Sequence, residues 1–185
     1  MNNLKDSLIR SVENNCGWDA YQRTQTLLNV NVSKDVEYQR NFVYFYKVRR
    51  NANWRQKFFE YMQDKKFDKN VSFEEVLKHL YSFRKSLEPS FASKLLATIN
   101  DKMPIWDKNV IVALGIDDSA RNTINGCVEI YNKICEAIKG LIQTQNILDY
   151  IWEFDNIFPN CKNISDVKKV DYLLWYMGKN NDKII

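Results

Sequence analysis

The amino-acid sequence predicts an all-α protein. Its 185 residues include only five glycines and three prolines, so few positions force a helix to stop. Apolar residues recur at helical spacing, and no stretch shows the sustained polar–apolar alternation of a half-buried strand. With 45% hydrophobic and 14% aromatic residues, the chain can bury a sizeable core. We expect a compact multi-helix bundle, built as one domain over residues 1–185 or as two lobes sharing a core.

In the N-terminal half, the helix boundaries follow from polar runs between the apolar stretches. These runs lie at 14–17, 31–33, 51–53 and 65–70. Ser72 and Glu75 form a capping box, in which the serine accepts an N–H of the first turn and the glutamate reaches back. The predicted helices cover residues 2–14, 17–29, 34–50, 53–64 and 73–84.

In the C-terminal half, prolines, glycine and capping residues set the boundaries. Pro89 suits the first turn of a helix, and Gly115 suits the end of another. The acids at 117–118 indicate the start of the longest amphipathic helix. The last helix, after Ser165, is expected to close the core. The predicted helices cover residues 89–99, 106–114, 118–142, 143–156 and 164–178.

Composition argues against several kinds of protein and site. No apolar run approaches the roughly 18–20 residues that span a bilayer, and the polar N-terminus lacks the apolar core of a signal peptide. We therefore expect a soluble, cytoplasmic protein with no membrane partner. Four scattered cysteines without a C-x-x-C pair, together with the single histidine, His79, predict reduced thiols, no metal site and no cofactor.

The basic residues are unevenly distributed. The net charge of +4 permits nucleic-acid binding without requiring it, but residues 40–66 interleave many cations with aromatic rings. One interpretation is a nucleic-acid surface, with Arg49, Arg50 and Arg55 on phosphates. Trp54 then belongs to a pocket for a base. The other interpretation is an amphipathic helix pair whose aromatic stripe is core and whose cations form a solvated face.

A single acid, Asp107, stands in the hydrophobic run Pro-Ile-Trp-Asp-x-x-Val that begins at Pro104. An unpaired buried carboxylate costs several kcal/mol, so this residue should be either a helix cap or a working acid. The two roles are compatible if the helix start faces a cleft. The preceding Trp106 is either core or an aromatic wall for an extruded base.

The stretch over residues 73–116 resembles the helix-hairpin-helix base-excision DNA glycosylase superfamily, in particular its 8-oxoguanine glycosylase-like branch. Leu87 and Ala92 fall where that family has its hairpin leucine and helix alanine, and residues 104–110 match its catalytic apolar-proline-x-x-aspartate segment. The resemblance implies that Asp107 stabilises an oxocarbenium-like charge or activates water during N-glycosidic cleavage. Ser90 aligns with the Schiff-base lysine of lyase members, which implies a monofunctional enzyme.

The chain also departs from that family. Glu88, Ser90 and their neighbours replace the hairpin glycines that bind a DNA phosphate there; glycine permits close backbone approach, and an acid repels phosphate. The expected nucleic-acid-binding residues are Arg49, Arg50, Arg55, Ser90 and Lys94.

Three functions follow from these observations: a monofunctional DNA glycosylase, a non-catalytic module that binds nucleic acid or a nucleotide, and a helical domain that binds another protein. The blocks at 48–62, 90–107 and 168–178 also look similar to bacterial proteins with the same glycosylase-like helical core. That resemblance implies a setting in phage defence or mobile elements for some of them, without a reaction.

Overall fold

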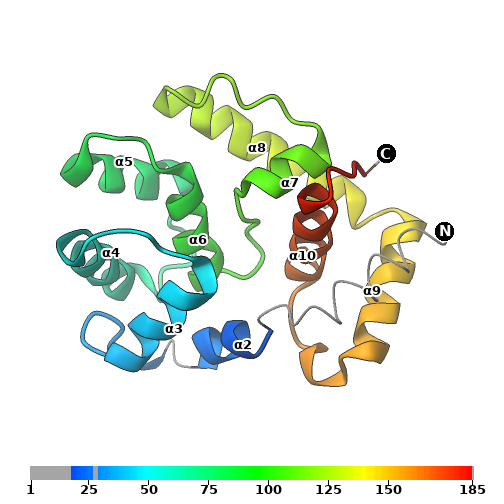
Figure 1. Cartoon of the computed structure of the whole chain (residues 1–185), viewed down its shortest axis with the longest axis horizontal. Coiled ribbons are helices and arrows are strands. Elements are labelled where there is room, and N and C mark those ends of the chain that lie inside the picture. The colour runs from blue at the N-terminus through cyan, green and yellow to red at the C-terminus, as the bar shows by residue number, and fades with distance from the viewer. Residues whose placement is uncertain (1–17, 27–28, 185) are drawn as a thin grey trace. The chain divides into compact units, whose positions relative to one another are not determined.

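A computed structural model describes residues 18–26 and 29–184, and this part of the chain is helical without any strand (Figure 1). The predicted all-α class is therefore confirmed. The predicted helix at 2–14 lies outside the described residues. None of the described helices is long and apolar enough to cross a membrane. The chain divides into two compact units, the first ending at Asn100 and the second beginning at Asp101.

The first unit holds helices α2 to α6. Their bounds are α2 (Trp18–Thr26), α3 (Val36–Tyr46), α4 (Ala52–Lys65), α5 (Phe73–Arg84) and α6 (Pro89–Ile99). Helix α3 is shorter than predicted because Lys47 adopts a left-handed conformation, with φ of 52°. The N–H of Val48 then donates to the carbonyl of Val43 at 3.0 Å, which ends the helix. Arg49 and Arg50 consequently follow α3 instead of lying on it.

Aromatic side chains form much of the core of the first unit. The ring of Phe42 lies 4.6 Å from that of Tyr46 and 5.5 Å from that of Phe58, measured between centroids. The aromatic stripe of residues 40–66 is thus mainly core, as the second interpretation of that segment predicted. Tyr44 is the exception, with 66% of its surface exposed.

Helices α5 and α6 form the hairpin of the first unit. Ser72 accepts the N–H of Glu75 at 3.1 Å, which confirms the predicted serine cap of α5. The carboxylate of Glu75 turns towards α4, where it binds Lys65 at 3.0 Å and Tyr61 at 3.2 Å. Pro89 opens α6 at its first turn, as predicted.

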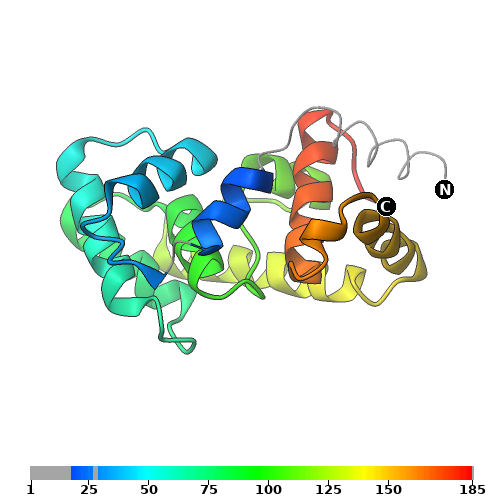
Figure 2. The same cartoon turned by 90° about the horizontal axis from the view of Figure 1, so that it is seen from below.

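The second unit holds α7 (Lys108–Leu114), α8 (Ile124–Leu141), α9 (Gln145–Ile157), η2 (Pro159–Cys161) and α10 (Asp166–Lys179). Helix α10 packs against α7 most extensively and also contacts α8 and α9; both views show it beside α7 (Figures 1 and 2). Gly178 permits this approach, because a Cβ atom there would lie 1.8 Å from the carbonyl oxygen of Asn109. Gly115 ends α7 with φ of 63°, as predicted.

Helix α8 begins six residues later than predicted, at Ile124 in place of residue 118. Its cap is Thr123, which accepts the N–H of Gly126 at 3.0 Å. The carboxylate of Asp117 instead accepts the N–H and the hydroxyl of Ser119, both at 2.9 Å. A short polar turn therefore competes successfully with helix initiation at these acids.

Candidate functional site

Asp107 is the N-cap of α7. Its backbone is extended, with φ of −126° and ψ of 150°, and its Oδ1 accepts the N–H of Asn109 at 3.0 Å. The residue is half-buried, so its carboxylate combines a capping role with partial access to solvent. The capping interpretation of Asp107 is confirmed, and a role in chemistry stays a prediction.

The loop that leads to Asp107 is held by hydrogen bonds from other elements of the second unit. Ser165 donates to the carbonyl of Asp101 at 2.5 Å, and Tyr131 on α8 donates to the carbonyl of Pro104 at 2.9 Å. The N–H of Ile105 donates to both carboxylate oxygens of Asp171, at 3.1 and 3.3 Å. The loop before Asp107 is therefore fixed at three backbone positions.

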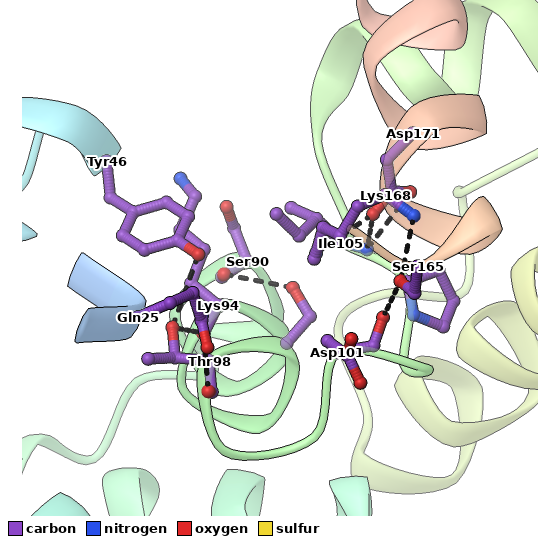
Figure 3. Close-up of polar contacts among 12 residues, drawn as sticks. Gln25, Tyr46, Ser90, Lys94, Thr98, Asp101, Ile105, Ser165, Lys168 and Asp171 are labelled. Atoms are coloured by element: carbon purple, nitrogen blue, oxygen red, sulfur yellow. Dashed lines mark hydrogen bonds and ion pairs between the residues drawn. The ribbon is translucent and has the colours of Figure 1, made fainter. Parts of the chain in front are cut away.

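Asp171 belongs to a buried ion pair on α10. Its carboxylate lies 3.1 Å from the ammonium of Lys168, and the two side chains are only 6% and 4% exposed (Figure 3). Burial raises the pKa of Asp171 to about 6, although Lys168 opposes the shift. Burial also lowers the pKa of Lys168. The negative charge of Asp107 contributes a smaller rise in the pKa of Asp171.

Sequence reasoning missed this ion pair, because it treated the last helix only as an element that closes the core. A signal exists in the spacing: Asp171 lies three residues before Leu174 and seven before Gly178, and thus on the buried face of α10. A charge on an apolar helical face needs a partner, and Lys168 is one turn away.

In the first unit, the acid of the hairpin binds two arginines. Glu88 precedes α6 and its side chain is 2% exposed; its Oε1 lies 2.9 Å from Nη2 of Arg50 and 3.2 Å from Nε of Arg84. The guanidinium of Arg50 also lies over the ring of Phe91, at 4.7 Å. Glu88 therefore joins the segment after α3 to the end of α5 and is electrostatically compensated.

This network gathers cations that the sequence separates. Arg49 is exposed beside Arg50, and Lys85 is exposed beside Arg84. We call these four residues the hairpin cations. Sequence reasoning included the first two and missed Arg84 and Lys85, because Arg84 ends α5 and meets Glu88 only through the turn between α5 and α6.

The other predicted binding residues lie in the first unit with different surroundings. Arg55, Ser90 and Lys94 are half-buried. The ammonium of Lys94 lies 5.4 Å from the centroid of the Phe91 ring, and the carbonyl of Ser90 accepts the hydroxyl of Ser93 at 3.0 Å. Figure 3 shows Ser90 and Lys94 on α6. Their predicted contacts with nucleic acid stay predictions.

The two tryptophans predicted to form a base pocket are core residues of separate units. Trp54 is 5% exposed and its ring stacks on Phe58 at 4.9 Å, while Trp106 is 4% exposed. Both side chains are buried, and their predicted contacts with a base stay predictions.

Metal chemistry has no visible residue set in the described ranges. Among those residues, no group of three or more His, Cys, Asp or Glu side chains is placed to hold a metal ion. Cys127, Cys135 and Cys161 are free thiols, as predicted for the cysteines, and Cys16 lies outside the described residues. Burial raises the pKa of Cys135 to about 11, so this thiol stays protonated near neutral pH.

No protein-family model matches the chain, and neither the curated proteins nor the solved structures include one that is similar to it.

Proposed function

We propose that the protein binds DNA through the hairpin cations and acts as a monofunctional glycosylase of the helix-hairpin-helix type. The observation that carries the proposal is the pairing of Glu88 with Arg50 and Arg84, next to which Arg49 and Lys85 are exposed in the chain. Arg50 and Arg84 are already held by Glu88, so these two would lose less side-chain freedom on binding a phosphate, while Arg49 and Lys85 add exposed charge beside them.

The network also removes the main objection that the sequence raised. An acid at the hairpin would repel phosphate if it were exposed and unpaired. Glu88 is buried and bound by two arginines, so its charge is compensated before any ligand arrives. The hairpin then presents net positive charge to a phosphate, even though its glycines are missing.

In the proposed reaction, the bond between C1′ of an extruded nucleotide and its base breaks, and the base departs with a proton. Water supplies the hydroxyl that remains on C1′ and gives up the proton. The carboxylate of Asp107 either stabilises the positive charge that develops on the sugar or accepts the proton of the water. No amine nucleophile is assigned, because Ser90 occupies the position that resembles the lyase lysine.

A second candidate is a nucleic-acid-binding module without catalysis. The capping bond from Asn109 to Asp107 favours it, since this bond gives the carboxylate a sufficient structural reason to be present. The two candidates share the hairpin cations and differ only in the chemistry of Asp107.

The binding step is tested by measuring the affinity for duplex DNA across a salt series. In the double variant Arg49→Gln/Lys85→Gln, we expect weaker binding. We also expect the slope of log affinity against log salt concentration to become shallower by about one to two, because fewer phosphates are neutralised and fewer counterions are released. The matched control is Lys139→Gln/Lys162→Gln, which removes the same charge from exposed positions of the second unit. Equal slopes for the two variants would contradict binding at the hairpin.

A further inference from the structure

We propose that the buried pair Lys168–Asp171 is a positioning device for Asp107. The pair binds the loop two residues before the cap of α7 and fixes where the Asp107 carboxylate lies. The positioning of the loop is inferred from contacts within the second unit. The effect of this positioning on catalysis rests on the proposed function of Asp107.

The contacts form a continuous chain from α10 to Asp107. Lys168 holds the Asp171 carboxylate at 3.1 Å, and that carboxylate accepts the N–H of Ile105 (Figure 3). Ile105 is separated from Asp107 only by the buried Trp106, whose ring limits movement of this stretch. A change in the charge state of Asp171 therefore acts on backbone two residues from the candidate acid.

The surroundings of Asp171 make this device sensitive to pH. Asp171 is paired with Lys168 on α10. The other titratable groups that face this pair are Tyr131 and Cys135 on α8, and Asp101 and Asp107 on the loop. Lys168 favours the charged form of Asp171 while Asp107 and burial oppose it. Together these influences give Asp171 a pKa of about 6. A change of pH around that value therefore alters the charge of the carboxylate that holds the loop.

Helix α10 offers an internal control. The neighbouring Lys169 is equally buried, with 3% of its side chain exposed, and its ammonium lies 2.8 Å from the carboxylate of Asp155 on α9. This second pair ties α10 to α9, and the ammonium of Lys169 binds carboxylates of these two helices (Asp155 and Asp166) and not the loop at 101–107. Removing it tests the general cost of losing a buried ion pair from the same helix.

The test compares Lys168→Met/Asp171→Asn with Lys169→Met/Asp155→Asn in the full chain. Both variants lose one buried pair and leave no lone buried charge, so both are expected to fold. Asparagine replaces the two carboxylate oxygens that accept the N–H of Ile105 with one neutral amide oxygen, so it holds the loop more weakly while keeping the size of the side chain.

The first readout is the amide NMR signal of Ile105 from about pH 4 to about pH 8. In the native protein and in Lys169→Met/Asp155→Asn, the signal should move with a midpoint near pH 6. In Lys168→Met/Asp171→Asn it should not titrate. A flat native profile, or the same loss of titration in both variants, would overturn the proposal.

The second readout is hydrogen exchange at the N–H of Asn109, which donates to Asp107. We expect about tenfold faster exchange in Lys168→Met/Asp171→Asn than in the native protein, and no such change in Lys169→Met/Asp155→Asn. Unchanged exchange in the first variant would overturn the positioning role.

Base release from DNA is the third readout. A drop of about tenfold in kcat with unchanged DNA affinity is expected for Lys168→Met/Asp171→Asn alone. If the native protein releases base and this variant does so equally well, the catalytic consequence is overturned. If the native protein releases none, the proposed function fails, while the two structural readouts still decide the positioning role.

Discussion

The carboxylate of Asp107 accepts the N–H of Asn109, so a substitution at this residue acts on α7 as well as on any chemistry. The two effects can be separated by choosing the replacement. Asparagine is about as good an N-cap as aspartate, whereas alanine cannot accept the bond. The residue is therefore suited to an experiment in which charge and capping are removed independently.

We predict that Asp107→Ala lowers the free energy of unfolding by about 1 kcal/mol, while Asp107→Asn changes it by less than about 0.5 kcal/mol. Denaturant unfolding measures both. Thr123→Ala, which removes the cap of α8 in the same unit, should resemble Asp107→Ala. An equal loss for the asparagine and alanine variants of Asp107 would show that more than the cap depends on its charge.

Replacing Glu88 should affect stability more than replacing an exposed glutamate, because Glu88 is buried and bound by two arginines. Glu88→Gln should lower the free energy of unfolding by about 1–3 kcal/mol, because it weakens the bonds to Arg50 and Arg84 at a buried site. Glu74→Gln is the matched control: Glu74 pairs with Lys78 on the surface of α5, and such pairs contribute little. A similar decrease in the free energy of unfolding for Glu88→Gln and Glu74→Gln would contradict the stabilising role of Glu88.

At the scale of elements, α10 and α7 meet at a glycine. Gly178→Ala should destabilise the protein by about 2 kcal/mol or more, because its Cβ would overlap the backbone of Asn109 and one helix must shift. Gly140→Ala is the control in α8, where a Cβ has nothing within 4 Å. It should stabilise by about 0.5–1 kcal/mol. Thermal unfolding of both variants checks the contrast, and a tolerated Gly178→Ala would contradict the close packing.

Sequence patterns predicted elements best where local chemistry decides them. The start of α5 at Ser72 and the end of α7 at Gly115 depend on a cap and a glycine a few residues away, and both were predicted. The predicted end of α3 and the predicted start of α8 were wrong. A left-handed lysine, Lys47, ends α3 early, and a competing turn delays the start of α8 to the residue after Thr123.

The candidate site divides in the same way. Asp107 stands out from its place after Pro104, and its capping bond is local. The role of Asp171 depends on a hydrogen bond to Ile105, 66 residues away in sequence. The compensation of Glu88 by Arg50 spans 38 residues. Contacts of that range follow from packing of helices, which periodicity alone does not specify.

At the scale of the whole molecule, Asp171 links stability to pH. Burial raises its pKa from the ordinary 3.8 to about 6, with Lys168 opposing, so the folded state binds this proton more tightly than the unfolded state. The contribution of this proton to the free energy of unfolding is fully present below about pH 4 and is lost as the pH rises through about 6.

We therefore predict that, from about pH 4 to about pH 7, the free energy of unfolding of the native protein falls by about 3 kcal/mol relative to Lys168→Met/Asp171→Asn. Denaturant unfolding at several pH values measures the difference. Lys169→Met/Asp155→Asn retains Asp171 and should follow the native curve. Parallel curves for the native protein and the first variant would show that Asp171 does not titrate in this range.

We propose that this protein removes a base from DNA and that Asp107 carries the chemistry. The most direct test follows base release and DNA binding in the same samples, on single strands and on duplexes with an oxidised or mismatched base. The native protein and Asp107→Asn should bind with equal affinity and equal salt dependence, and only the native protein should release base. Release by Asp107→Asn at the native rate, or no release by either protein, would contradict the claim.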